Sequence, residues 1–382
     1  MTTAAELEPW LLRTYKRMPI DLARGEDVFV WDTAGRRYLD FYAGHAVAST
    51  GHCHPRVVKA IQEQAAKLIF YSNVAGLPLR EEAAKLLVES APRAFTHAFF
   101  ANSGTEANEA ALKMARKHTG RAAVVAMHGG FHGRTAASMS VTGVDKYRVP
   151  PLVPGTAFVP FGSLPAASAA ITAETAAVIL EPIQSMAGVK TATPEYFQGL
   201  RALCDRHGAL LIYDEVQTGI GRTGTMFFAP RHGVLPDLIT LAKGIASGVP
   251  LSSVLVSAPV AERVQHGDHG ATFGAGPIAM AAMKATLEVL RDEKLPENAA
   301  ATGAYLAERL RDIAGVLEVR GEGLLRGIKI DGDASALQKK LLAGGVIAGT
   351  ADEPGVLRLM PPLTLRREHV DEFVRVLLAS LA

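Results

Sequence analysis

Two side chains with useful chemistry stand at the ends of apolar runs. Asp214 ends the run 209–213, and Lys243 leaves a second apolar run at 240–242. A lysine amine forms a Schiff base with an aldehyde, and a carboxylate keeps a pyridine nitrogen protonated so that the ring accepts electrons. The pair therefore predicts a site for pyridoxal 5'-phosphate (PLP).

A turn between a strand-like and a helical segment indicates where a phosphate group binds. The strand-like run 97–101 leads into this turn, and 106–117 has helical periodicity. Ser103 and Glu106 have capping-box spacing, and Gly104 lets an anion approach the backbone closely. An ordinary capped helix explains the same residues equally well.

A glycine-rich loop follows the strand-like run 122–126. Its glycines flank Phe131, whose ring can face a planar ligand, and Arg134 can bind a carboxylate with two hydrogen bonds. The loop holds fragments of a dinucleotide fingerprint but lacks the correct glycine spacing and the later acid, so nicotinamide binding is not predicted. A loose loop around a core phenylalanine is the alternative.

Six motifs in this order resemble the class III PLP-dependent aminotransferases, and within that class the chain is most similar to acetylornithine aminotransferases. The similarity runs from Tyr15 to the C-terminus. The motifs lie at 103–110, 130–135, 181–184, 214–219, 221–224 and 242–244.

Alternating strand-like and helical segments predict an α/β fold with a mainly parallel central sheet. Ligands of such sheets bind at the carboxyl ends of the strands. Ser103, Phe131, Glu181, Asp214 and Lys243 all fall at or just beyond such ends. The strand-like runs are 97–101, 122–127, 177–181, 209–213, 237–241 and 252–256.

The resemblance implies the type I PLP-dependent transferase fold, which is that of aspartate aminotransferase. It places a large PLP-binding domain at 45–290 and a smaller α+β domain at 1–44 together with 291–382. A final helix is expected at 367–381, where apolar residues recur at helical spacing and form a packing face.

The resemblance also assigns the cofactor contacts. Lys243 carries the cofactor and moves the proton, and Asp214 supports the ring nitrogen. Gln217 binds the phenolic oxygen, and Phe131 stacks on the ring. The remaining residues expected at the cofactor are Ser103, Gly104 and Thr105 at the phosphate, Glu215 and Val216 beside Asp214, and Thr272 from a neighbouring subunit. Thr272 thereby implies a homodimer with shared active sites.

Substrate contacts follow from the same resemblance. Arg358 matches the arginine that binds the α-carboxylate of glutamate, while Arg134 and Tyr15 match residues that bind the carboxylate remote from the reacting carbon. Ala271 is expected beside the substrate. Each arginine taken alone would more often be a surface ion-pair partner, and the match to the family motifs reverses that expectation.

Two departures from the family pattern bear on substrate choice. Relatives carry Gly-Glu after the Glu-Pro-Ile-Gln motif, and that glutamate pairs with the α-carboxylate arginine when an ω-amino substrate is bound. Here the two positions are Ser185 and Met186. His45 stands where relatives have isoleucine or tyrosine, either as a core histidine or as a ligand.

The resemblance implies amino transfer between an N-acylated ω-amino acid, with N2-acetylornithine first, and 2-oxoglutarate. The products are the semialdehyde and glutamate, in arginine or lysine biosynthesis. Other class III donors remain open: succinylornithine, N-succinyl-diaminopimelate, a carrier-linked lysine precursor, ornithine and 4-aminobutyrate. A PLP-dependent mutase or racemase and a non-enzymatic PLP-binding regulator are the competing classes.

Composition agrees with a large enzyme. The chain has 382 residues, 48% of them hydrophobic and 20% charged, and its 40 basic and 38 acidic residues give a net charge of +2. Without a basic block, neither nucleic acid nor a membrane is an expected partner. Residues 1–8 lack the pattern of a secretion signal and two cysteines are too few for a disulfide framework, so a cytoplasmic protein is expected. Neighbouring side chains in 52–54 (His-Cys-His) rarely converge on one ion, so no metal site is predicted.

Overall fold

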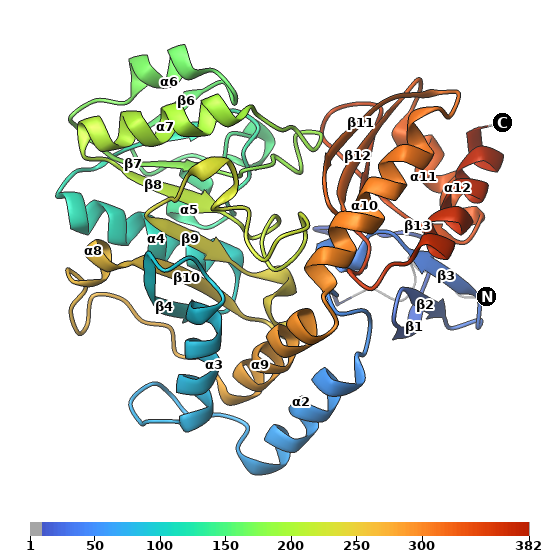
Figure 1. The fold of residues 1–382 in the computed structure, drawn as a ribbon, viewed down its shortest axis with the longest axis horizontal. Helices are drawn as coiled ribbons and strands as arrows, with labels where there is room; N and C mark the ends of the chain where they lie inside the picture. The colour runs from blue at the N-terminus through green and yellow to red at the C-terminus, as the bar shows by residue number, and fades with distance from the viewer. Residues whose placement is uncertain (1–9, 382) are drawn as a thin grey trace.

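A seven-stranded sheet built from the middle of the chain forms one of two lobes in the computed structural model, which describes residues 10–381 (Figure 1). Only β10 runs against its neighbours, so the expected mainly parallel sheet is confirmed. The strands, in spatial order, are β4 (Phe95–Ala101), β10 (Ser252–Ser257), β9 (Leu238–Leu241), β8 (Leu210–Asp214), β7 (Thr175–Leu180), β5 (Ala123–Met127) and β6 (Thr156–Val159).

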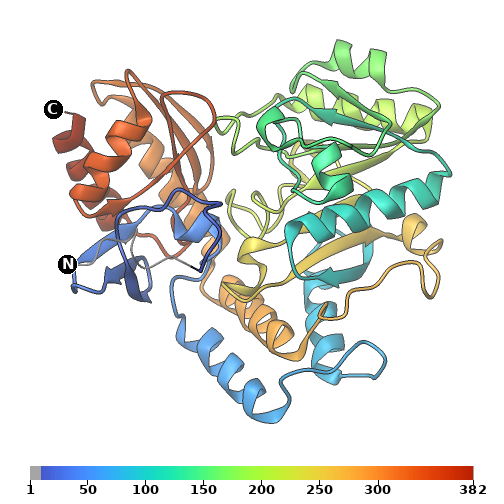
Figure 2. The same cartoon turned by 180° about the vertical axis from the view of Figure 1, so that it is seen from behind.

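Helices cover both faces of this sheet because its strands are apolar on both sides. In β8, Leu210 and Ile212 pack in one core cluster with α4 (Gly104–Thr119), while Leu211 and Tyr213 pack in another with α7 (Pro194–His207). Figure 1 shows the α7 face, and Figure 2 shows α4 along the opposite face. The other helices of this part of the chain are α2 (Pro55–Lys67), α3 (Pro78–Glu89), α5 (Ala136–Ser140), α6 (Leu164–Ala170), α8 (Ala258–Ala261) and α9 (Pro277–Asp292), with the 3-10 turns η2 (Asp145–Tyr147) and η3 (Arg231–Gly233).

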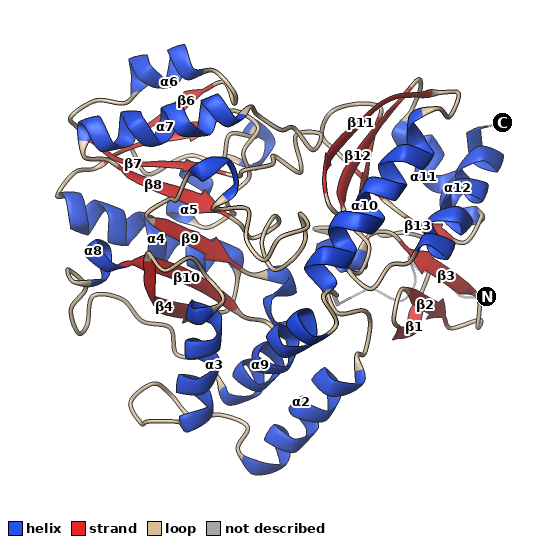
Figure 3. Ribbon diagram, viewed as in Figure 1, coloured by secondary structure: helices blue, strands red, loops and turns tan. Residues whose placement is uncertain are grey.

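Both ends of the chain build the second lobe, which has two four-stranded sheets (Figure 3). Its first sheet joins the chain ends, because β13 (Val346–Ile347) pairs in parallel with β3 (Arg37–Asp40). That sheet also contains β1 (Leu22–Glu26) and β2 (Phe29–Asp32); the second contains β11 (Val316–Glu322), β12 (Leu325–Ile330), β15 (Val356–Leu359) and β14 (Gly349–Thr350). The helices here are α10 (Leu295–Arg311), α11 (Ala334–Ala343) and α12 (Arg367–Leu381).

The predicted packing role of α12 is confirmed, because its buried residues include Val370, Phe373 and Leu377. The exact domain limits at 44 and 290 stay a prediction; they fall inside α1 (Ala43–Ala46) and α9. No helix within residues 10–381 combines the length and the apolar character needed to cross a membrane.

Candidate active site

The turn between β4 and α4 forms an anion site at a helix N-terminus. Ser103 caps α4: its hydroxyl accepts the N–H of Glu106 at 3.4 Å and donates to the Glu106 carboxylate at 2.8 Å. Within the described chain, the N–H groups of Gly104 and Thr105 have no acceptor. A Cβ on Gly104 would lie 3.0 Å from Val216 Cγ1, so glycine keeps this turn open. Free N–H groups and the helix dipole together favour a phosphate.

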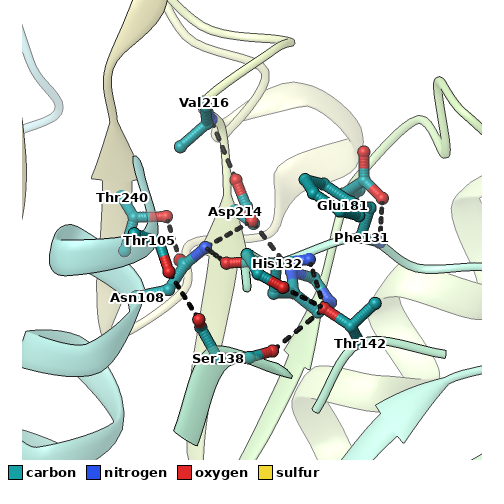
Figure 4. A network of polar contacts seen from close by, with 11 residues as sticks. Thr105, Asn108, Phe131, His132, Ser138, Thr142, Glu181, Asp214, Val216 and Thr240 are labelled. Atoms are coloured by element: carbon teal, nitrogen blue, oxygen red, sulfur yellow. Dashed lines mark hydrogen bonds and ion pairs between the residues drawn. The ribbon is translucent and has the colours of Figure 1, made fainter. Parts of the chain in front are cut away.

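Asp214 is held by a buried network that Figure 4 shows. Its Oδ2 accepts from His132 Nδ1 and from Asn108 Nδ2, both at 2.8 Å, and its Oδ1 accepts from the Val216 N–H at 3.1 Å. Asn108 in turn accepts from the Thr240 hydroxyl at 2.7 Å. Strand alternation explains this meeting, because Asp214 continues the face of Leu210 and Ile212 that packs on α4.

Lys243 follows β9 at the same edge of the sheet and begins the short 3-10 helix η4 (Lys243–Ala246). Its φ of 47° lies in the left-handed region, which costs a non-glycine residue about 1–2 kcal/mol and is often found at functional sites. Burial lowers the pKa of Lys243, against the opposing attraction of Asp214 and Glu181. The amine makes no hydrogen bond with any described residue, which leaves it available to a ligand.

Glu181, just beyond β7, is a second buried acid in this cluster. Its carboxylate accepts the N–H of Phe131 at 2.8 Å and so fixes the backbone of the glycine-rich loop. Burial, and secondly the charge of Asp214, raise the pKa of Glu181 to about 7. The rings of Phe131 and Tyr147 make a T-shaped contact with 5.3 Å between their centroids.

The two arginines occupy different environments. Arg134 is exposed, and its guanidinium carbon lies 4.5 Å from the centroid of the Tyr147 ring and 5.9 Å from that of Phe131. Arg358, on β15 of the second lobe, is only 6% exposed. It donates to the Thr350 carbonyl at 2.7 Å. Neither arginine has an ion pair with a carboxylate in the described part of the chain.

A left-handed turn carries His45 into the site. Residues Ala43, Gly44, His45 and Ala46 have φ values of 48°, 58°, 69° and 66°, so α1 is left-handed throughout and strained at its three non-glycine residues. The His45 ring packs on Tyr42 at 4.5 Å, and its carbonyl accepts from Gln217 Nε2 at 3.4 Å. Partial desolvation, helped by the charges of Arg358 and Lys243, lowers the pKa of His45 to about 4. The ring is therefore neutral near pH 7.

The other predicted site residues lie in varied positions. The Glu215 carboxylate accepts the N–H groups of Phe228 and Ala229, at 2.6 and 2.8 Å, so its side chain anchors that loop. Tyr15 is 71% exposed and makes no hydrogen bond or ring contact with Arg134 among the described residues. Thr272 is exposed and Ala271 partly buried, in the loop before α9. Their assigned roles stay predictions.

Sequence reasoning missed several residues that the fold brings to this cluster. Asn108 and His132 lie inside recognised motifs, and a polar residue on the buried face of α4 was the available signal for Asn108. Tyr42 and Tyr147 gave no such signal, because their neighbours in the fold are distant in sequence.

The residues fit PLP on their own geometry. Asp214 is a buried acid, 3% exposed, and has no lysine or arginine partner in the described chain. It therefore suits a protonated ring nitrogen. Lys243 offers an unbonded amine, and the start of α4 offers free N–H groups to a phosphate. Asp214, Lys243 and the start of α4 at Ser103 therefore supply, in that order, the acceptor, the amine and the anion site that this cofactor needs.

Comparisons with known proteins agree. The chain is 45% identical to the acetylornithine aminotransferase of Methanothermobacter thermautotrophicus, over 97% of this chain and 96% of that protein. It is 42% identical to that of Methanopyrus kandleri, over 98% and 97% of the two chains.

Solved structures also match over nearly the whole chain. Acetylornithine aminotransferase from Elizabethkingia anophelis superposes with a TM-score of 0.86 at 32% identity, over 97% of this chain and 95% of the other. Ornithine aminotransferase from Toxoplasma gondii gives a TM-score of 0.91 at 31% identity, over 97% and 92%. The family model "Aminotransferase class-III" matches residues 11–381. The chain therefore belongs to the class III aminotransferases, which are PLP-dependent enzymes.

Proposed function

We propose that this enzyme transfers the amino group of an N-acylated ω-amino acid, with N2-acetylornithine first, to 2-oxoglutarate. The supporting observation is the pair of arginines without carboxylate partners in the described chain, Arg358 from one lobe and Arg134 from the other. Two such cations suit substrates with two carboxylates, or with one carboxylate far from the amine. The names of the relatives favour the acetylornithine substrate over the other acylated donors.

The roles of the chain's own residues follow from their positions. Bound PLP supplies an aldehyde and an electron-accepting ring. Asp214 holds a proton on the ring nitrogen, and the His132 and Asn108 donors keep its carboxylate in place. Burial lowers the pKa of Lys243, and its amine removes the proton from the reacting carbon of the substrate.

The carboxylates of the substrates select between the arginines. Arg358 binds the α-carboxylate of glutamate, and Arg134 binds whichever carboxylate lies away from the reacting carbon. Acetylornithine then places its α-carboxylate at Arg134 and its terminal amine at the site of Lys243. The names of the relatives also lead us to propose a role in arginine or lysine biosynthesis, and we propose a cytoplasmic location.

A panel of amine donors with 2-oxoglutarate, read as glutamate formed, tests this proposal. Acetylornithine should give the highest kcat/KM, ahead of succinylornithine, ornithine and 4-aminobutyrate. A preference for 4-aminobutyrate or for unacylated ornithine would replace acetylornithine as the substrate. Conversion of a single amino acid without any keto-acid acceptor would point to a mutase or racemase.

We also propose a homodimer with shared active sites. Exposed apolar side chains gather beside the Thr272 loop: Phe273 is 64% exposed and its ring lies 5.0 Å from Phe70. Asn73 Nδ2 donates to the Gly274 carbonyl at 3.0 Å, so this surface is continuous with that loop. The surface comprises Leu68, Ile69, Phe70, Tyr71, Val74 and Phe273. A second copy of the chain would bury it and bring Thr272 to the partner's phosphate site.

Light scattering of purified Phe273→Asp against the wild-type protein tests the dimer. The wild-type protein should have twice the monomer mass, and the variant should shift toward the monomer and bind PLP more weakly. A monomeric wild-type protein with full activity would refute shared sites.

A further inference from the structure

Arg358 is a buried cation whose described hydrogen-bond partners, Ser185 among them, are all neutral. Arg358 Nη1 donates to Ser185 Oγ at 3.2 Å and Nη2 lies 3.4 Å from the Tyr42 hydroxyl. With the Thr350 carbonyl, every described partner of this 6% exposed cation is neutral. Each terminal nitrogen keeps a second N–H that no described residue accepts.

The two acids of the loop that joins β14 to β15 pair with other residues. Asp352 pairs with Lys146 at 2.5 Å. Glu353 pairs with Arg320 at 2.7 Å and with Lys329 at 3.3 Å. Ser185 itself is fully buried.

A buried cation without a protein anion is stabilised by an anion from the ligand. An α-amino acid supplies one, because its carboxylate is attached to the carbon that bears the reacting amine. An ω-amino acid bound with its carboxylate at Arg134 leaves Arg358 unpaired. Because Arg358 has no protein anion beside it, the site favours α-amino acids whatever their side chain.

We propose that Ser185 is a specificity-determining residue whose neutral hydroxyl keeps Arg358 free, so that this site accepts α-amino acids as a class beside its ω-amino substrate. The inference rests on the proposed function and extends its range of donors. In the added reaction an α-amino acid loses its amino group and its α-hydrogen and gains a keto oxygen, becoming a 2-oxo acid. 2-Oxoglutarate makes the reverse exchange and becomes glutamate, so no oxidant is needed.

The test compares three donors in single-turnover half-reactions: glutamate, L-norvaline and N2-acetylornithine. Norvaline has an α-carboxylate and no second charge, so it isolates Arg358. The wild-type enzyme should convert norvaline with kcat/KM within about a hundredfold of that for glutamate, since it lacks only the contact with Arg134. No measurable conversion of norvaline would overturn the proposal.

Ser185→Asp places an acid against Arg358 and gives the decisive comparison. Glutamate and norvaline should each lose roughly thirtyfold in kcat/KM, while acetylornithine stays within about threefold of wild type or improves. Calorimetry with glutarate, which cannot react, should show the same weakening of Kd. Equal losses for all three donors would show a merely structural role and refute the proposal.

Ser185→Ala decides the question if Ser185→Asp does not fold. Loss of one neutral hydrogen bond should lower kcat/KM for glutamate and norvaline roughly threefold and leave acetylornithine unchanged. Equal effects on all donors, or none, would overturn the proposal.

Ser257→Ala is the matched control. Ser257 is buried at the end of the sheet away from the site and its hydroxyl has no described partner, so its loss should change kcat/KM for no donor. Failure of acetylornithine in the wild-type enzyme would refute the proposed function while the glutarate result still tests Ser185.

Discussion

Asn108→Leu should lower kcat/KM by more than its loss of folding stability explains. Asn108 Nδ2 donates to Asp214 at 2.8 Å and to the His132 carbonyl at 2.7 Å, and its Oδ1 accepts from Thr240 at 2.7 Å. Leucine is similar in shape and removes all three contacts. Asp214 then keeps its contacts with His132 and Val216 but loses one donor to its charge.

The size of the effect follows from the kind of bond lost. A hydrogen bond to a charged group contributes about 1.5–3 kcal/mol, so kcat/KM should fall roughly 10- to 150-fold. Both half-reactions should fall equally, because Asp214 supports the ring nitrogen in both. The pH dependence of the visible absorbance of bound PLP should also shift, since the proton on the ring is less well held.

Asn298→Leu is a control with the same bonding pattern in α10. Its Nδ2 donates to the carbonyls of Leu363 and Leu365 at 2.6 and 2.9 Å, and its Oδ1 accepts from Thr302 at 3.2 Å. Both variants should lower the Tm, but Asn298→Leu should keep its kcat per bound PLP. Equal kcat per bound PLP in the two variants would refute the role given to Asn108.

Two further predictions concern the arginines and a buried acid. Arg358→Ala should slow the glutamate half-reaction roughly thirtyfold and spare the acetylornithine half-reaction, whereas Arg134→Ala should slow both. Single-turnover kinetics with each donor check this. Equal loss of both half-reactions in Arg358→Ala would mean that Arg358 binds both α-carboxylates. Burial raises the pKa of Glu215 from 4.5 to about 7, so the folded state binds its proton more tightly and wild-type stability falls as pH rises through that range. Urea unfolding of Glu215→Gln at pH 4.5 and pH 8 should show this fall reduced by at most about 3 kcal/mol, and an unchanged pH dependence would contradict it.

The strands and the site edge were predictable because buried parallel strands are continuous apolar runs. The edge strand β6 was not predicted, since it has only four residues and lies between prolines. Partners of the catalytic acid depend on register, which a single sequence does not give: Asn108 is 106 positions from Asp214. Ser185 was noted as a departure from the family, but its bond with Arg358, 173 positions away, required the packing of two lobes.

Chemical trapping of PLP tests the central assignment, the pairing of Lys243 with Asp214, most directly. Borohydride reduction of the purified enzyme should fix the mass of the cofactor on the peptide that contains Lys243. Lys243→Ala should carry no trapped cofactor and should not turn over, while retaining phosphate binding at the start of α4. Trapped mass on another lysine, or turnover by Lys243→Ala, would contradict the assignment.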